Sequence, residues 1–346
     1  MDRALVSGTR CRGFDSRRVY HIRIMDNEIT IELKDGKLSP EELEELCTLG
    51  YNLENGILYK QDKTKALALY KRAYEEGSSR GANNFGYLLS LLGTSRSTTM
   101  MALSVLEEAA KAGNTVAMVN IGNIYEYGQR TGKPEYKEAA KWYQRAALLG
   151  DKRGSFNYAN LLHYGRGVRR DRETAFCIFE KLAKCGVREA PFYMGLYYEN
   201  GFVVEKNYSE ALRYYQAGAS MNDPYCYNQL GRMYCLGLGI PRKEPKMGFY
   251  YYEQAAKLGD VTGLSNMAYA YETGQGVEAD LVKAVEYYSR AAEAGEVNAI
   301  EALERLRNEL MPAPTKRGKV KTTAKSTKKT DEKDSSKDSE DEKLEK

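Results

Sequence analysis

The stretch AAKWYQRAALLGD, residues 139–151, places an aromatic pair between two pairs of alanines and ends in Gly-Asp. Its closing half recurs elsewhere in the chain, as AAKAGN from Ala109, AAKLGD from Ala255 and AAEAGE from Ala291. Self-similarity at a fixed period is typical of repeat proteins, in which each unit packs mainly on its neighbours. We place the origin of each unit at the small residue four positions after the glycine. These origins are 36 or 37 residues apart, at Gly81, Ala117, Gly154, Ala190, Cys226, Gly263 and Ala299.

Extrapolation back to Glu45 gives seven units over residues 45–298, and each unit is predicted to hold two helices. Positions 0, 4, 5 and 8 after an origin are small or apolar, as in Ala117, Ile121, Gly122 and Tyr125. At 100° per residue they share one helix face. Glycines in motifs such as GRGV (165–168) and GQGV (274–277) fit the left-handed cap that ends a first helix. Asp or Asn residues that cap the second helix follow, at Asp62, Asp171, Asn207 and Asp280.

The aromatic pair keeps the same phase in nearly every second helix. The pairs stand twelve residues before the next origin, at Leu69-Tyr70, Val105-Leu106, Trp142-Tyr143, Ile178-Phe179, Tyr214-Tyr215, Tyr251-Tyr252 and Tyr287-Tyr288. One helical hairpin of this size cannot bury its own apolar face, so we expect these pairs to fill a continuous core between hairpins. Trp142, the only tryptophan, is then the largest copy of a repeated core residue rather than a ligand-stacking residue.

The combined pattern, A-x(4)-G-x-x-Y-x-x-G-x-G-V followed by D-x(3)-A-x-x-W-Y-x-x-A-A-x-x-G, resembles the Sel-1-like repeat, a relative of the tetratricopeptide repeat. The resemblance implies an all-α, right-handed superhelical solenoid of about seven helix-turn-helix repeats. The second unit departs most, because YLLSLLGTSRSTTMMALSVL (87–106) lacks both the GxGV turn and the aromatic pair. We therefore expect a distorted hairpin there.

Three segments are predicted around this pattern. Residues 1–38 are an extension expected to be poorly ordered, with a brief alternation in NEITIELKDG (27–36) that fits a lone strand or no element. Residues 39–311 are the solenoid, which starts with Ser39 as the N-cap and ends in an amphipathic capping helix within 299–310. Residues 312–346 are rich in Lys, Thr, Ser, Asp and Glu and are expected to be disordered.

Residues of the types that commonly act in catalysis or metal binding are few. The two histidines, His21 and His163, have no Cys or Asp nearby at metal-ligand spacing, so we predict no metal site, no cofactor and no catalytic residue. The six cysteines have no CxxC spacing and fit reduced side chains in a cytoplasmic protein. No run of apolar residues is long enough for a membrane span, and no secretory signal is apparent. A formal net charge of +4 does not by itself point to nucleic acid or membrane.

A binding surface is predicted on the first helices, which line the inside of tetratricopeptide-like arrays. If positions 0, 4, 5 and 8 pack inward, positions 2, 6, 9 and 10 point into a groove. Amides there can bond a peptide backbone, and aromatic rings can anchor apolar side chains. The candidate residues are Asn83, Tyr87, Val119, Asn123, Glu126, Tyr127, Phe156, Asn160, His163, Tyr164, Phe192, Glu199, Asn228 and Arg232.

The predicted function is a protein-interaction scaffold whose concave groove binds a protein or peptide. Relatives in the family act as adaptors, so the resemblance implies binding without naming the partner. One alternative is a β-lactam-binding or hydrolysing enzyme of the cysteine-rich branch of this family. The resemblance would imply such an enzyme only if each repeat held a pair of cysteines at fixed positions. Another is a nucleic-acid adaptor acting through the basic segment 316–329, which holds seven basic residues and no acidic one.

Overall fold

The computed structural model describes residues 20–25, 28–33 and 36–310, and over these ranges it contains two strands and fifteen helices. The strands β1 (Tyr20–Met25) and β2 (Glu28–Leu33) pair antiparallel, with Tyr20 opposite Leu33 and Met25 opposite Glu28. The brief alternation in 27–36 is therefore a strand, and it has a partner that the sequence pattern did not indicate. Residues 1–19 and the predicted charged tail, 312–346, lie outside the described residues.

The helices form seven hairpins and a final single helix. The first helices of the hairpins are α1 (Pro40–Asn55), α3 (Ser79–Leu92), α5 (Thr115–Glu126), α7 (Lys152–Tyr164), α9 (Ala190–Asn200), α11 (Pro224–Leu236) and α13 (Val261–Thr273). The second helices are α2 (Lys63–Glu75), α4 (Arg96–Lys111), α6 (Tyr136–Leu148), α8 (Arg172–Lys184), α10 (Tyr208–Ser220), α12 (Pro245–Lys257) and α14 (Leu281–Glu293). The predicted capping helix is α15 (Val297–Leu310).

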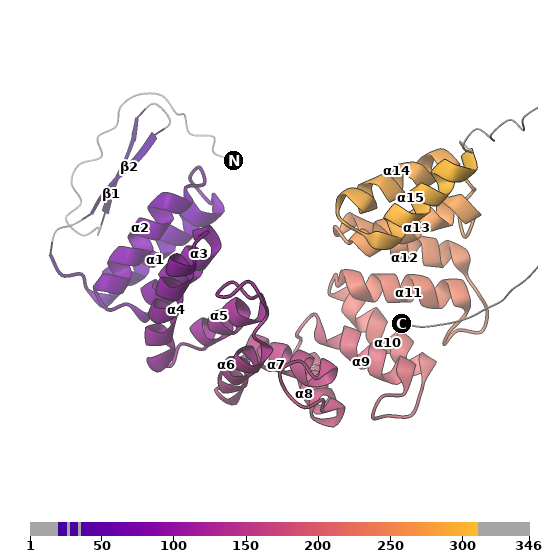
Figure 1. Cartoon of the computed structure of the whole chain (residues 1–346), viewed down its shortest axis with the longest axis horizontal. Helices are drawn as coiled ribbons and strands as arrows, with labels where there is room; N and C mark the ends of the chain where they lie inside the picture. Colours follow the sequence, from indigo (N-terminus) through magenta and orange to yellow (C-terminus); the bar gives the residue numbers. More distant parts are fainter. Residues whose placement is uncertain (1–19, 26–27, 34–35, 311–346) are drawn as a thin grey trace, which may run out of the picture.

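The hairpins stack into a curved array with two arms, so the described part of the molecule is U-shaped (Figure 1). Along the arm that holds α3 to α8, the first helices α3, α5 and α7 lie on the inner side of the curve and the second helices α4, α6 and α8 on the outer side. This order confirms the helical solenoid. The concave face is therefore formed by the first helices.

Local sequence explains where the helices start and stop. Ser39 accepts a hydrogen bond from the Glu42 amide while the Glu42 carboxylate accepts one from the Ser39 amide at 2.8 Å, which is a complete capping box. Asp171 caps α8 by accepting from the Thr174 amide at 2.9 Å. Gly165 ends α7 with φ of 73°, a left-handed conformation that costs glycine little.

The second residue of each aromatic or apolar pair fills the core. Tyr70, Leu106, Tyr143, Phe179 and Tyr215 are fully buried, and Tyr252 and Tyr288 nearly so. Trp142 is only half-buried, and the Arg145 guanidinium lies over its ring at 5.5 Å. Trp142, predicted as the largest copy of the repeated core residue, therefore packs against the core without being enclosed in it, because the helix phase puts Tyr143 toward the core and turns Trp142 partly to solvent.

Glycine on the first helix gives the buried ring its space. A Cβ added at Gly122 would lie 2.3 Å from the Tyr143 ring, and one at Gly195 would lie 2.4 Å from the Tyr215 ring. Atoms cannot approach this closely without displacing the ring or the helices. The fixed spacing of Gly and Tyr is thus a packing requirement in the four hairpins that pair Gly50 with Tyr70, Gly122 with Tyr143, Gly195 with Tyr215 and Gly231 with Tyr252.

The second unit forms a hairpin of a different shape. Its helices α3 and α4 are joined by Gly93–Ser95 alone, whereas seven residues, 165–171, join α7 to α8. Ser95 and Thr98 form a capping box that starts α4 directly after this short turn. The missing GxGV turn is therefore replaced by a shorter connection between longer helices.

Candidate partner-binding groove

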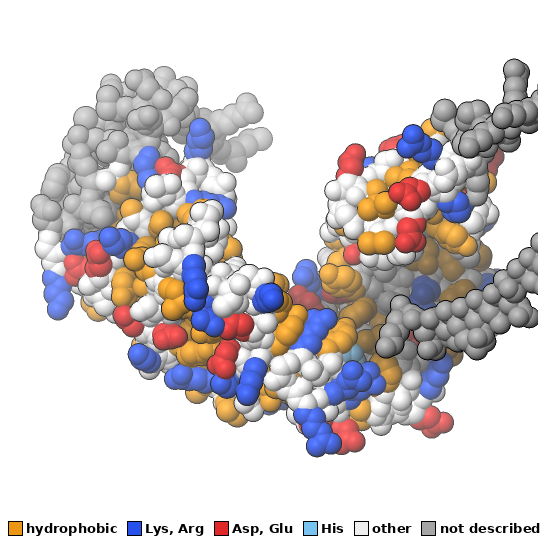
Figure 2. Space-filling model, in the orientation of Figure 1, with side chains coloured by type: hydrophobic (Ala, Val, Ile, Leu, Met, Phe, Trp, Pro, Cys, Tyr) orange, Lys and Arg blue, Asp and Glu red, His pale blue; other side chains and the backbone are white. Residues whose placement is uncertain are grey.

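The concave face is hollowed between the two arms of the molecule (Figure 2). The predicted groove residues lie on the first helices α3, α5, α7, α9 and α11, apart from Tyr127, which directly follows α5 as its C-cap. The structure therefore gathers all fourteen on one set of stacked helices. Their exposure divides them into three groups.

Three tyrosines of the predicted set are open to solvent. Tyr127 is 72% exposed, Tyr164 is 42% exposed and Tyr87 is 38% exposed. Tyrosine side chains combine an apolar ring with a polar tip, and they are frequent anchors in protein interfaces. These three remain candidates for direct contact with a partner.

Four of the predicted residues are buried, so the expectation that they point into an open groove is wrong. Val119 is 1% exposed, His163 is 3%, Asn228 is 7% and Asn83 is 8%. Positions 2 and 9 lie against neighbouring helices, where these polar groups bond within the protein. Asn83 accepts from the Asn120 amide nitrogen at 3.0 Å, and His163 Nδ1 lies 2.9 Å from the Tyr197 hydroxyl.

The half-buried polar members of the set bond within a hairpin and, in one case, between neighbouring hairpins. The Tyr143 hydroxyl donates to Glu126 and to Asn123, each at 2.7 Å. The Tyr215 hydroxyl donates to Glu199 at 2.9 Å, and Arg232 of the following repeat forms an ion pair with the same carboxylate.

Contacts between successive first helices involve the remaining three. Asn160 donates to the Tyr193 hydroxyl at 2.7 Å. Phe156 packs edge-on against Tyr193 with ring centroids 5.6 Å apart, and Phe192 lies 5.7 Å from Tyr225. These side chains shape the floor of the groove, and most of their polar atoms already have partners.

In four hairpins, the residue at position 9 is a glutamate that accepts the hydroxyl of the buried tyrosine, at Tyr70, Tyr143, Tyr215 and Tyr288. Beside Tyr252, position 9 is Cys235. Where the ring is Phe179, which has no hydroxyl, position 9 is His163. Burial and the Glu126 carboxylate raise the pKa of the Tyr143 hydroxyl far above its usual value, so it stays a donor. The recurring carboxylates are therefore structural acceptors.

Sequence reasoning missed three exposed side chains that share the phase of the open tyrosines. Tyr269 on α13 is 52% exposed, Leu91 on α3 is 51% and Leu236 on α11 is 48%. Tyr269 occupies the position of Tyr87 counted from its own origin, so carrying the same phase into the seventh unit would have found it. We call the exposed set Tyr87, Leu91, Tyr127, Tyr164, Leu236 and Tyr269 the groove row.

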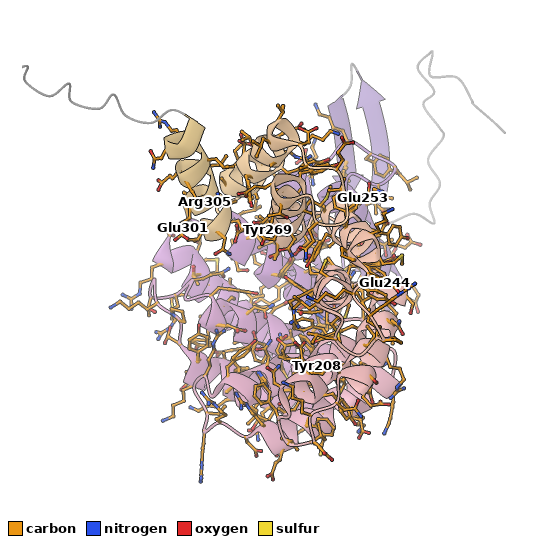
Figure 3. The ribbon with its side chains drawn as sticks, turned by 90° about the vertical axis from the view of Figure 1, so that its right-hand side faces the viewer. Tyr208, Glu244, Glu253, Tyr269, Glu301 and Arg305 are labelled. Atoms are coloured by element: carbon orange, nitrogen blue, oxygen red, sulfur yellow. The ribbon has the colours of Figure 1, made fainter. Side chains whose placement is uncertain are left out.

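Tyr269 also lines a cleft of about 480 Å³ between α13 and α15, together with Asn266, Glu301 and Arg305. Figure 3 shows Tyr269, Glu301 and Arg305 close together at one edge of the array. Arg305 forms an ion pair with Glu272 at 2.6 Å, and Glu272 accepts the Tyr288 hydroxyl. The cleft therefore offers an aromatic ring beside fixed charges.

Among the described residues, no three His, Cys, Asp or Glu side chains gather as a metal site. The five cysteines within those ranges are all free, with Cys47, Cys226 and Cys235 buried and Cys177 and Cys185 exposed. No helix of the described chain combines the length and apolar character needed to cross a bilayer.

Comparison with known families gives one match, to the Sel1 repeat. Its model matches residues 47–78, 115–151, 153–187, 189–223, 224–260 and 262–296. The unmatched stretch 79–114 corresponds to the second unit, whose short turn differs from the others.

Among known proteins, the chain is 25% identical over 295 residues to an uncharacterized protein of Neisseria meningitidis, which covers 76% of this chain and 60% of that protein. It is also 25% identical over 266 residues to a chitin synthase regulator of Saccharomyces cerevisiae, covering 73% of this chain and 38% of the regulator. The chain thus spans less than two thirds of either relative. The solved structure of a Sel1 repeat protein from Oxalobacter formigenes is similar in fold, with a TM-score of 0.58, 24% identity and 76% coverage of each chain.

Proposed function

The chain belongs to the Sel1 repeat family, and from this premise we propose that it is a non-catalytic scaffold whose concave face binds a protein or an extended peptide. The observation that carries the proposal is the groove row, six large apolar or aromatic side chains exposed on the first helices or, for Tyr127, directly after one. Large exposed apolar groups that recur on one face are a common mark of a protein-binding surface.

The groove is well suited to a partner that runs along it. Its floor is built from side chains whose hydrogen bonds are already made, as for Asn123 and Asn160, so the floor is fixed before a partner arrives. Fixed side chains lose little conformational entropy on binding, which favours affinity. The row is spread over five of the seven hairpins at both arms, which suits a ligand with several separate anchors.

The relatives support a regulatory role in binding rather than a chemical reaction. One relative is a chitin synthase regulator, but this chain spans only 38% of its length. We therefore infer from it a regulatory role in general and no particular target. The enzyme alternative of the cysteine-rich branch gains no support, since all five described cysteines are free.

The test is a quantitative affinity purification with the whole chain. The groove variant carries Tyr127→Ala, Tyr164→Ala and Tyr269→Ala, and the control carries Tyr250→Ala, a 47% exposed tyrosine on the second helix α12. We expect partners recovered by the wild type to be lost with the groove variant and kept with the control. Equal recovery with all three proteins would refute the groove as the binding surface.

A further inference from the structure

The stretch GRGVRRDR (165–172) forms the loop between α7 and α8 together with the first residue of α8, and it places four arginines at the centre of the array. Arg166, Arg169 and Arg170 are exposed, and Arg172 is half-buried. Over the described residues, no ion pair joins any of the four to a carboxylate. The one acidic side chain in the loop, Asp171, is engaged as the N-cap of α8. We call these four residues the arginine cluster.

Aromatic rings orient two of the guanidinium groups. Arg166 lies over the Tyr164 ring at 4.8 Å and over Tyr136 at 5.7 Å, and Arg172 lies over Phe202 at 3.8 Å. A guanidinium stacked on a ring keeps the N–H groups at its edge free to donate, and its planar fork suits carboxylates. Arg172 Nε is buried and has no hydrogen-bond partner among the described residues. The exposed guanidinium groups of Arg166, Arg169 and Arg170 can therefore receive acidic groups that the array does not supply.

Charge is distributed unevenly along the array. Residues 152–187, which include α7 and α8, contain eight basic and three acidic side chains, whereas residues 261–310 at the C-terminal end contain four basic and nine acidic ones. Figure 2 shows blue side chains over α7 and α8 at the middle of the curve. The centre is therefore strongly basic, and the end from which the chain continues is acidic.

The segment that follows α15 has the reverse order of charge. Residues 316–329 contain seven basic and no acidic side chains, and residues 331–346 contain eight acidic and four basic ones. If it runs back from α15 along the array, its basic part passes the acidic end and its acidic part meets the arginine cluster. Such an arrangement lowers the electrostatic energy of both halves.

The length of this segment is sufficient. First helices that neighbour one another pack at roughly 8–10 Å, so the four steps from α15 to α7 span on the order of 40 Å. The 20 residues from 311 to 330 reach about 70 Å when extended and average about 25 Å as a flexible chain. The acidic part therefore reaches the cluster without full extension.

We propose that the acidic segment 331–346 of this same chain binds the arginine cluster and covers the adjoining part of the groove. This goes beyond the scaffold function, because it adds an internal competitor for the partner. Arg166 stacks on Tyr164, which belongs to the groove row, so a segment bound at the cluster lies beside that anchor. A partner then has to displace the segment, and its apparent affinity falls by the fraction of chains in which the segment is bound.

The test uses the full chain with p-benzoylphenylalanine in place of Leu344 and maps the crosslinks formed on illumination. We expect crosslinks within one molecule to residues 164–172, at a yield independent of protein concentration. The yield should fall at least fivefold when Arg166, Arg169 and Arg170 are each changed to Glu. A control with Lys152→Glu, Arg153→Glu and Lys181→Glu makes the same charge change at exposed sites of the same unit and should keep the yield.

A second variant guards against misfolding of the array. Asp338→Asn, Glu340→Gln, Asp341→Asn and Glu342→Gln alter no residue of the array and should also reduce the yield at least fivefold. Crosslinks to other parts of the array, crosslinks between two copies, or a yield unchanged by both variants would overturn the proposal. A further contrary outcome is that the wild type binds a single-stranded oligonucleotide, the cluster variant does not, and the crosslinks map elsewhere. The cluster would then be a nucleic-acid site, and the proposal would be overturned.

Discussion

The Tyr143 hydroxyl donates a hydrogen bond of 2.7 Å to the Glu126 carboxylate and thereby ties the second helix of the third hairpin to its first helix. Tyr143 is fully buried, and the same hydroxyl also donates to Asn123. Equivalent bonds join Tyr215 to Glu199 and Tyr288 to Glu272. In these hairpins a core tyrosine thus fixes an acidic side chain of the first helix.

Replacing Tyr143 with Phe should therefore destabilise the protein. The ring still fills the core, but Glu126 loses its donor, which we expect to cost about 1–2 kcal/mol in the free energy of unfolding. The matched control is Tyr252→Phe, whose hydroxyl lies beside the Cys235 thiol rather than a carboxylate. Denaturant titration should show a smaller loss for the control, and equal losses would contradict the role assigned to the Tyr–Glu bond.

Gly122→Ala should destabilise the same hairpin by about 1–3 kcal/mol, because the new Cβ would lie 2.3 Å from the Tyr143 ring. Adding Tyr143→Leu removes the ring that causes the clash. In a double-mutant cycle, the double variant should be more stable than the sum of the two single losses predicts. Additive losses would show that the ring does not occupy this space.

Stability should depend on pH through His163. Burial, with the charges of Arg172 and Arg170, lowers the pKa of His163 to about 4 in the folded protein, below its ordinary value of 6.5. The unfolded chain therefore binds the proton more readily. The free energy of unfolding should fall as pH falls from about 6.5 to 4, by up to about 3 kcal/mol. His163→Phe should flatten this part of the profile in thermal melts, and an unchanged slope would assign the effect to other groups.

Thiol labelling should separate the cysteines by burial. In a Cys11→Ser variant, Cys177 and Cys185 should react rapidly with a disulfide reagent, whereas Cys47, Cys226 and Cys235 should react only on unfolding. Burial raises the pKa of these three thiols, which further lowers their reactivity. Fewer than two fast thiols without added reductant would point to a disulfide and would favour the cysteine-rich branch.

The solenoid could be predicted from the sequence because one packing solution repeats. Four hairpins place a glycine opposite a buried ring, the other hairpins keep a small residue at the same position, and most helices start at a side-chain cap, so the 36-residue period recurs wherever the geometry does. Exposure within the groove was harder to predict. A helical wheel separates an inward face from an outward one, but it does not show that position 2 meets the next first helix, as Asn83 meets Asn120.

The sequence pattern also could not predict which member of each aromatic pair is buried in the core. Trp142 and Tyr143 are adjacent, and the core takes the residue whose phase points at Gly122. Similarly, Glu126 and Glu199 are charged residues of the kind expected at an exposed groove position. Each nevertheless accepts a hydrogen bond from a tyrosine hydroxyl of another helix. Such contacts depend on how two helices are placed in space. In the sequence, these contacts are visible only as Glu paired with Tyr, and His163 paired with Phe179, at a fixed separation.

The most direct measurement of the central claim is photo-crosslinking to a recovered partner from two sites in the same hairpin. One chain carries p-benzoylphenylalanine in place of Tyr127, which is 72% exposed at the end of α5, and the other carries it in place of Gln144, exposed on the second helix α6. We predict that the partner crosslinks from position 127 and not from position 144. Crosslinks from position 144 alone would contradict a concave binding surface.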